Sequence, residues 1–118
     1  DEVAILRLLK RMLTKMGHRV DVATEGERAI KMFKEACASG RPYDVTILDL
    51  TVPGGMGGAK VASLLLEVDP QSKLVVSSGY SNDPIMANYK EHGFKGVIPK
   101  PYTKVQLETV IQQMITMK

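Results

Sequence analysis

Three side chains with complementary chemistry each follow a short apolar run of the sequence: Asp49, Ser78 and Lys100. A carboxylate at the end of a strand can accept a phosphoryl group as an acyl phosphate, provided that a divalent cation and fixed donors offset the charge. A lysine ammonium can pair with the phosphoryl group or the free carboxylate, and a serine hydroxyl can donate a hydrogen bond to a phosphoryl oxygen. These residue types indicate phosphoryl transfer to Asp49.

The same chemistry implies a magnesium ion. Mg²⁺ prefers near-octahedral oxygen coordination and uses a few carboxylates together with phosphate oxygens and water. A second acid is therefore expected near Asp49. Asp1 and Glu2, at the start of the first predicted helix, are the candidates.

The elements that must position these groups follow from the spacing of apolar residues and from glycine and proline breaks. The pattern predicts helices over 3–16, 25–39, 59–68, 84–91 and 105–117, and strands over 19–23, 43–48, 73–77 and 96–98. Helices that alternate with short Val, Ile and Leu-rich strands indicate a doubly wound α/β domain with a parallel sheet. Ligands in such sheets bind beyond the carboxyl ends of the strands, where the acid, the hydroxyls and the cation should converge.

Composition limits the class of protein. A chain of 118 residues with 44% hydrophobic content predicts one domain over 1–118. The formal charge of +3, without any long run of like charges, gives no indication of nucleic-acid binding. A single cysteine, Cys37, and the absence of a long apolar segment predict a soluble cytoplasmic domain without membrane contact.

Four stretches carry a family resemblance. Asp1 and Glu2 opening a helix, LDLTVPGG around Asp49, VVSSGY around Ser78 and IPKPY around Lys100 together resemble the receiver domain of two-component response regulators. The resemblance implies a five-stranded flavodoxin-like sheet in the order 2-1-3-4-5. It also implies Mg²⁺, a histidine kinase phosphodonor domain as partner, in cis or in trans, and signalling by a conformational change in a phosphorelay.

The resemblance assigns roles to single residues. By this likeness Asp49 is the phosphoacceptor and a metal ligand, Asp1 is a metal ligand, Thr51 binds the metal through its backbone carbonyl, Ser78 is the switch hydroxyl, and Lys100 pairs with the phosphoryl group. Thr51 and Tyr80 occupy places that tune the attacking water in receivers, and a bulky Tyr80 would shield the acyl phosphate. His18 and His92 are given no catalytic role.

The chain also departs from the receiver pattern. Receivers begin with an apolar strand that ends in two adjacent acids, whereas this chain starts at the second of those acids, so we expect the first strand of the sheet to be missing and domain 1–118 to be truncated at its N-terminus. That strand either lies upstream in the natural protein or comes from another chain. Val97 stands where receivers often carry Tyr or Phe, which argues against switching by an aromatic side chain.

Several function classes fit these residues. The leading one is a phosphoacceptor module of a hybrid sensor histidine kinase, because the stretches LTVPGGMGG and SSGYSNDP resemble the sequences of receivers attached to such kinases. The domain would then catalyse only its own phosphorylation and dephosphorylation. The alternatives are a stand-alone response regulator, a pseudo-receiver that works by binding alone, and an aspartate-nucleophile phosphatase, against which Thr51 argues because that class has an acid there. Dimerisation through the last strand and helix is a further expectation.

Overall fold

Three parallel strands form the sheet: β1 (Thr46–Asp49), β2 (Leu74–Ser78) and β3 (Gly96–Pro99), in the order β1-β2-β3. The computed structural model describes residues 2–23, 25–49, 58–78, 84–100 and 102–116. The helices are α1 (Glu2–Lys15), α2 (Gly26–Ala38), α3 (Gly58–Val68), α4 (Pro84–Ala87) and α5 (Lys104–Thr116), with a 3-10 helix η1 (Tyr89–His92). The predicted α/β class and the parallel sheet are confirmed, and no helix in these ranges is long and apolar enough to cross a bilayer.

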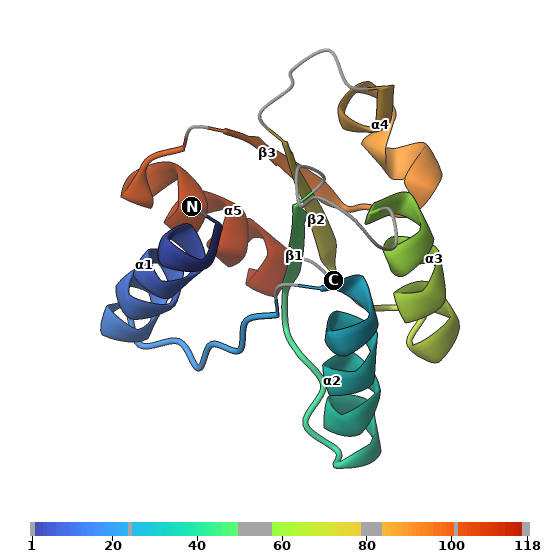
Figure 1. Cartoon of the computed structure of the whole chain (residues 1–118). Helices are drawn as coiled ribbons and strands as arrows, with labels where there is room; N and C mark the ends of the chain where they lie inside the picture. The colour runs from blue at the N-terminus through green and yellow to red at the C-terminus, as the bar shows by residue number, and fades with distance from the viewer. Residues whose placement is uncertain (1, 24, 50–57, 79–83, 101, 117–118) are drawn as a thin grey trace.

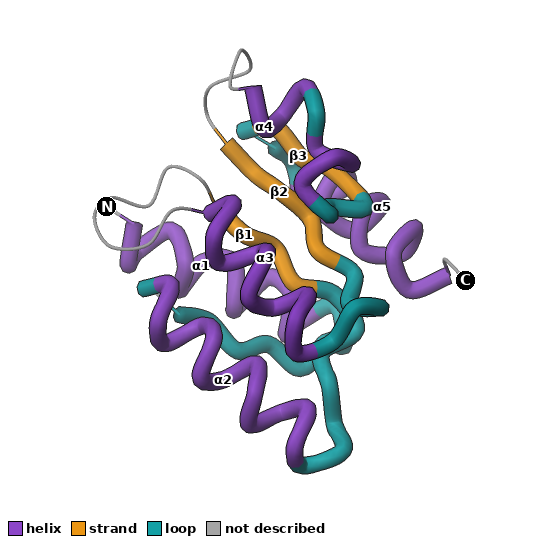
Figure 2. The backbone as a smooth tube through the Cα atoms, turned by 90° about the vertical axis from the view of Figure 1, so that its right-hand side faces the viewer, coloured by secondary structure: helices purple, strands orange, loops and turns teal. Residues whose placement is uncertain are grey.

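Helices cover both faces of the sheet (Figures 1 and 2). On one face α5 buries Leu107, Ile111 and Met114 against the strands, and α1 packs its apolar side against this group. On the other face α2, α3, α4 and η1 lie over a second cluster. That cluster contains Phe33, Leu48, Val61, Ala62, Leu65, Leu74, Val76, Met86 and Phe94. β2 is buried along its whole length because it lies between two strands and two helical layers, which explains its unbroken apolar and small residues.

The strand predicted over 19–23 is wrong, because the described residues form no strand there. In the order 2-1-3-4-5 the only neighbour of that strand is the first strand, so the segment lacks the ladder partner that it needs. A side-chain contact holds it instead, since Tyr43 Oη donates to Asp21 Oδ2 at 2.7 Å. β1, β2 and β3 keep the predicted order and correspond to the last three strands of 2-1-3-4-5.

The helix predicted over 84–91 is divided into α4 and η1. The chain after η1 turns at Gly93, which has φ +87° and lies directly against the side chain of Leu66. Only glycine adopts this backbone conformation without strain, and a Cβ atom there would overlap Leu66 Cδ1. The turn returns the chain to β3, where Lys95 N donates to Leu74 O at 2.8 Å.

α5 begins at a capping box. Thr103 Oγ1 accepts a hydrogen bond from Gln106 N at 3.1 Å, and Thr103 N donates to Gln106 Oε1 at 2.8 Å. This reciprocal pair satisfies backbone donors that the first turn of a helix leaves unpaired. The spacing T-x-x-Q therefore places the cap of α5 at Thr103, three residues after Lys100.

Replacing Gly93 by alanine should destabilise the domain more than the same change at Gly40. Both glycines have positive φ, but no atom lies within 4 Å of a Cβ built at Gly40. Gly40→Ala should cost about 1–2 kcal/mol for the backbone conformation alone. Gly93→Ala adds the overlap with Leu66 and should cost about 1–3 kcal/mol more. Urea unfolding of the two variants measures both costs, and equal values would contradict the close packing of Gly93.

Stability at alkaline pH should depend on Tyr43. Burial and, next in size, the hydrogen bond to Asp21 raise the pKa of Tyr43 to about 12. The pKa of tyrosine in an unfolded chain is about 10, so the unfolded state loses the proton first and the free energy of unfolding falls between pH 10 and 12. Tyr43→Phe should remove this part of the fall. Unfolding free energies measured from pH 8 to 12 give the comparison, and parallel curves for both proteins would contradict it.

Candidate functional site

The carboxyl ends of the three strands bring Asp49, Ser78 and Lys100 to one edge of the sheet. Asp49 is the last residue of β1, Ser78 is the last residue of β2, and Lys100 follows β3 directly. Ser78 is in register with Pro99, and Lys100 N donates to Ser78 O at 2.9 Å. The sheet register therefore sets the spacing of these groups, as the sequence predicted.

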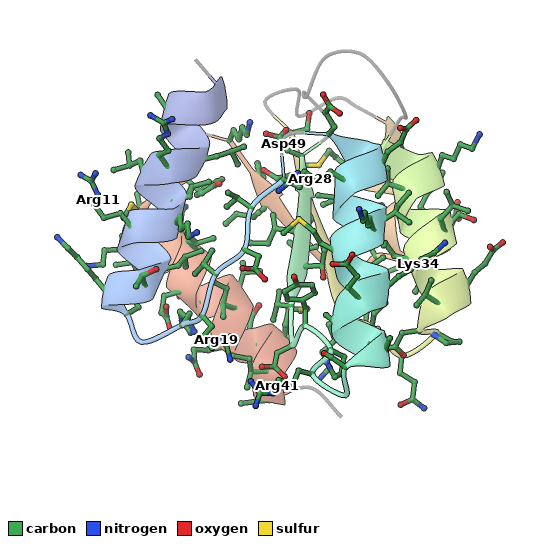
Figure 3. All side chains as sticks on the ribbon, turned by 60° about the horizontal axis from the view of Figure 1, so that its bottom comes forward. Arg11, Arg19, Arg28, Lys34, Arg41 and Asp49 are labelled. Atoms are coloured by element: carbon green, nitrogen blue, oxygen red, sulfur yellow. The ribbon has the colours of Figure 1, made fainter. Side chains whose placement is uncertain are left out.

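Asp49 and Lys100 form an ion pair at this edge. Lys100 Nζ donates to Asp49 Oδ2, and about one fifth of each side chain is exposed, 21% for Lys100 and 19% for Asp49. Figure 3 shows Asp49 at the end of β1. Partial exclusion of water strengthens this attraction relative to a surface pair. The pair places a carboxylate and a cation side by side at a partly exposed edge of the sheet.

Two serines lie next to this ion pair in the centre of the sheet. Ser77 is in register with Asp49 on one side and with Ile98 on the other. Ser77 and Ser78 are each 1% exposed. Both hydroxyl-bearing residues are therefore part of the sheet's interior, and neither is a surface serine of the adjoining loop.

The predicted magnesium ligands are only partly described. Asp49 is the described carboxylate at this edge, and the other proposed ligands, Asp1 and Thr51, lie outside the described residues, as does Tyr80. Within the described ranges, no group of three His, Cys, Asp or Glu side chains could hold a metal ion. Val97 lies in β3 and packs, partly buried, against the cluster under α3 and α4.

Two polar contacts away from this edge had no sequence signal that identified them. Lys95 Nζ, at the opposite end of the sheet, donates to Ser72 O at 3.0 Å and to Gln71 O at 3.2 Å. His18, which the sequence analysis gave no catalytic role, is half-buried, and its Nε2 lies 3.1 Å from Glu108 Oε2. Hydrogen bonds from Gln112 and His18 lower the pKa of Glu108. These contacts join segments far apart in the chain, so residue spacing could not reveal them.

The family model of the response regulator receiver domain matches residues 1–112. The chain belongs to this family. This receiver domain is 31% identical over 104 residues to the chemotaxis protein CheY of Thermotoga maritima, covering 86% of this chain and 82% of that protein. It is 29% identical over 115 residues to the sensor kinase CckA of Brucella abortus, covering 98% of this chain and 12% of that protein. It spans only 19% of a matching transcription factor of Candida albicans, at 25% identity over 96% of this chain.

Solved structures give the same fold. A receiver domain from Methanospirillum hungatei has a TM-score of 0.84 at 20% identity, over 98% of this chain and 87% of that one. The receiver domain of a sensor histidine kinase from Pseudomonas aeruginosa, described with a magnesium ion in its active site cleft, has a TM-score of 0.84 at 17% identity, over 99% and 93% of the two chains. The helices and strands of this chain are thus arranged as in the receiver fold.

The interaction between Asp49 and Lys100 can be measured by a double-mutant cycle. Asp49→Asn and Lys100→Met each break the ion pair, so the effects of the two changes should not add. The double variant should be more stable than the sum predicts by about 0.5–3 kcal/mol, the usual range for residues in contact. Urea unfolding gives the four free energies.

Lys95→Met is the control for this cycle. Lys95 directly precedes β3, at the opposite end of the strand from Lys100, and its ammonium donates to Gln71 O and Ser72 O. Combined with Asp49→Asn, it should give additive effects to within about 0.5 kcal/mol. Additivity of the Asp49 and Lys100 changes as well would contradict a stabilising pair.

Proposed function

We propose that this receiver domain accepts a phosphoryl group on Asp49 from a histidine kinase phosphodonor domain, as one step of a two-component phosphorelay. The observation that carries the proposal is the Asp49–Lys100 ion pair at the carboxyl edge of the sheet, beside the buried Ser78. Phosphoryl transfer to a carboxylate needs a positioned nucleophile and fixed donors that offset the charge on the transferring group. These residues supply both.

The proposed step uses the ionised carboxylate of Asp49. One carboxylate oxygen attacks the phosphorus of the donor, the bond from phosphorus to the donor nitrogen breaks, and the donor keeps that electron pair. Lys100, which already pairs with Asp49, moves with the negative charge toward the phosphoryl oxygens and keeps its proton. The Ser78 hydroxyl donates a hydrogen bond to one of those oxygens, and this contact separates the phosphorylated state from the free one.

Magnesium fits this set of donors. Asp49 provides an oxygen ligand at the strand end where a phosphoryl group would arrive, and oxygen is the ligand that Mg²⁺ prefers. Asp1 and the backbone carbonyl of Thr51 would complete the protein ligands. The bound ion supplies positive charge to the transferring oxygens. Tyr80 and Thr51 are proposed to set the lifetime of the acyl phosphate by controlling the approach of water.

The signal is proposed to travel through the backbone at this edge. Val97 has no ring whose rotation could report the state of Ser78, and it packs among aliphatic and aromatic side chains. The backbone bond from Lys100 N to Ser78 O couples the ends of β2 and β3 directly. A shift of the Ser78 hydroxyl would thus move the β3 edge. A pseudo-receiver that acts by binding alone is the second candidate, which Val97 favours.

The proposed context is a hybrid sensor histidine kinase, supported by the likeness to the sensor kinase CckA over 98% of this chain. The likeness to CheY supports the alternative of a stand-alone response regulator, because this chain covers 82% of the length of that protein. A cytoplasmic location without direct nucleic-acid contact stays a prediction. A homodimer through β3 and α5 is proposed as well, supported by Val105 of α5, which is 74% exposed.

A further strand is proposed to complete the sheet along the free edge of β1. Within the described part of the chain, β1 pairs only with β2. An open edge leaves a row of backbone donors and acceptors without ladder partners. The receiver order 2-1-3-4-5 places its first strand at this edge, so the strand would come from upstream in a longer chain or from another chain.

Phosphorylation of the chain tests the proposed function. Incubation with Mg²⁺ and a small acyl-phosphate donor should add a single phosphoryl mass to the intact protein. Asp49→Asn should abolish the adduct because it removes the nucleophile, and chelation of Mg²⁺ should prevent its formation. Asp44→Asn, an exposed acid just before β1, is the matched control and should leave the adduct unchanged.

Two results would contradict the proposal. One is an adduct that persists in Asp49→Asn, which would place the phosphoryl group elsewhere. The other is no adduct together with no binding of beryllofluoride, a stable mimic of the phosphoryl group, because rapid hydrolysis would then not account for the missing mass. The second result would favour a domain that works by binding alone.

A further inference from the structure

The hydroxyl of Ser77 is buried in the sheet, and no described residue bonds to it. Ser77 is 1% exposed, and its Oγ has no hydrogen-bond partner among the described residues. A buried hydroxyl that gives up its bonds to water and makes none in the protein lowers the stability of the fold. Among the described residues Ser72 Oγ is the second such hydroxyl, in a residue that is 4% exposed. Ser77 lies near the carboxyl end of β2, and Ser72 lies two residues before the other end.

The register places Ser77 beside the proposed phosphoacceptor. Ser77 is the parallel partner of Asp49 in β1 and of Ile98 in β3. Side chains that are in register on neighbouring strands share one face of a sheet, and such strands lie about 4.8 Å apart. Ile98 belongs to the cluster under α5, so Asp49 and Ser77 both lie on the face of the sheet that α5 covers. Ser72 has no such neighbour, because the β1–β2 register begins at the pair of Thr46 and Leu74.

We propose that Ser77 is a positioning residue that donates a hydrogen bond from its hydroxyl to the carbonyl oxygen of Asp49 once Asp49 is phosphorylated. This inference rests on the proposed function. When one Asp49 oxygen bonds to phosphorus, the leaving group departs with its electron pair and the other oxygen becomes a neutral carbonyl acceptor. No atom of Ser77 is gained or lost in the step.

The charge at the site explains why the hydroxyl is useful only after phosphorylation. In the unmodified protein the Lys100 ammonium donates to Asp49 Oδ2, and this charge-assisted bond serves the carboxylate better than a neutral hydroxyl would. Phosphorylation moves the negative charge to the phosphoryl oxygens, and Lys100 follows it. The carbonyl oxygen then needs a neutral donor, and Ser77 is the adjacent residue in the sheet. The unsatisfied hydroxyl thus destabilises the free state and stabilises the phosphorylated one.

Alanine substitutions at the two serines separate this role from a purely structural one. The melting temperature is measured for the wild type, Ser77→Ala and Ser72→Ala, first alone and then with Mg²⁺ and increasing beryllofluoride. Without ligand both variants should melt at or above the temperature of the wild type, because each loses an unsatisfied hydroxyl. With ligand, Ser72→Ala should respond like the wild type. Ser77→Ala should need about two- to tenfold more beryllofluoride to reach half of its maximal stabilisation, a change in affinity that corresponds to the loss of one hydrogen bond.

The outcomes distinguish this inference from the proposed function. If the wild type responds to beryllofluoride and both alanine variants respond equally well, Ser77 has no positioning role while the proposed function stands. If the wild type neither responds nor accepts a phosphoryl group, the proposed function fails and the role of Ser77 fails with it. Should Ser77→Ala not fold, Ser77→Cys keeps the volume with a weaker donor and should show a smaller loss of affinity in the same direction. A cysteine variant with unchanged affinity would overturn the inference.

Discussion

The pairing of β2 with strands on both sides is the interaction on which the site depends. β2 fixes Asp49 through its register with β1, and it fixes Lys100 through its register with β3 and the bond from Lys100 N to Ser78 O. The groups of the candidate site come from three separate segments, so the accuracy of their relative positions depends on this strand pairing. Full burial of β2 makes the ladder rigid, because water cannot compete for its backbone groups.

Much of the fold could be predicted because the local helix and strand preferences of most segments agree with the structure that these segments have in the domain. Apolar spacing identified α1, α2, α3 and α5 and the three paired strands. The prediction failed over 19–23, where β-prone residues form no strand, because pairing is a non-local property that needs a neighbour. It also failed to divide α4 from η1, where the backbone of Asn88 leaves the helical conformation with φ −116° and ψ 40°. The first error concerns a contact between distant segments, and the second concerns the backbone of one residue.

The candidate site was predictable to the same extent and for the same reason. Asp49, Ser78 and Lys100 follow apolar runs, and the rule for parallel sheets brings such positions together. What the sequence could not show is the hydrogen-bonding state of each group. Ser77 and Ser78 look equivalent as a serine pair, yet only the structure places Ser77 on the face of Asp49 with a hydroxyl that no described residue satisfies. Lys95 and Lys100 flank β3, and only the structure shows that Lys100 pairs with a carboxylate while Lys95 donates to backbone carbonyls.

The capping box of Thr103 and Gln106 links the start of α5 closely to Lys100. Two residues separate Lys100 from Thr103, so the chain has little slack between the charged site and the fixed first turn of the helix. α5 has 13 residues and is about 20 Å long. A displacement of Lys100 would therefore shift the first turn of α5, and the buried residues Leu107, Ile111 and Met114 would have to repack against the sheet. A change at the sheet edge would thus reach the core along the whole length of this helix.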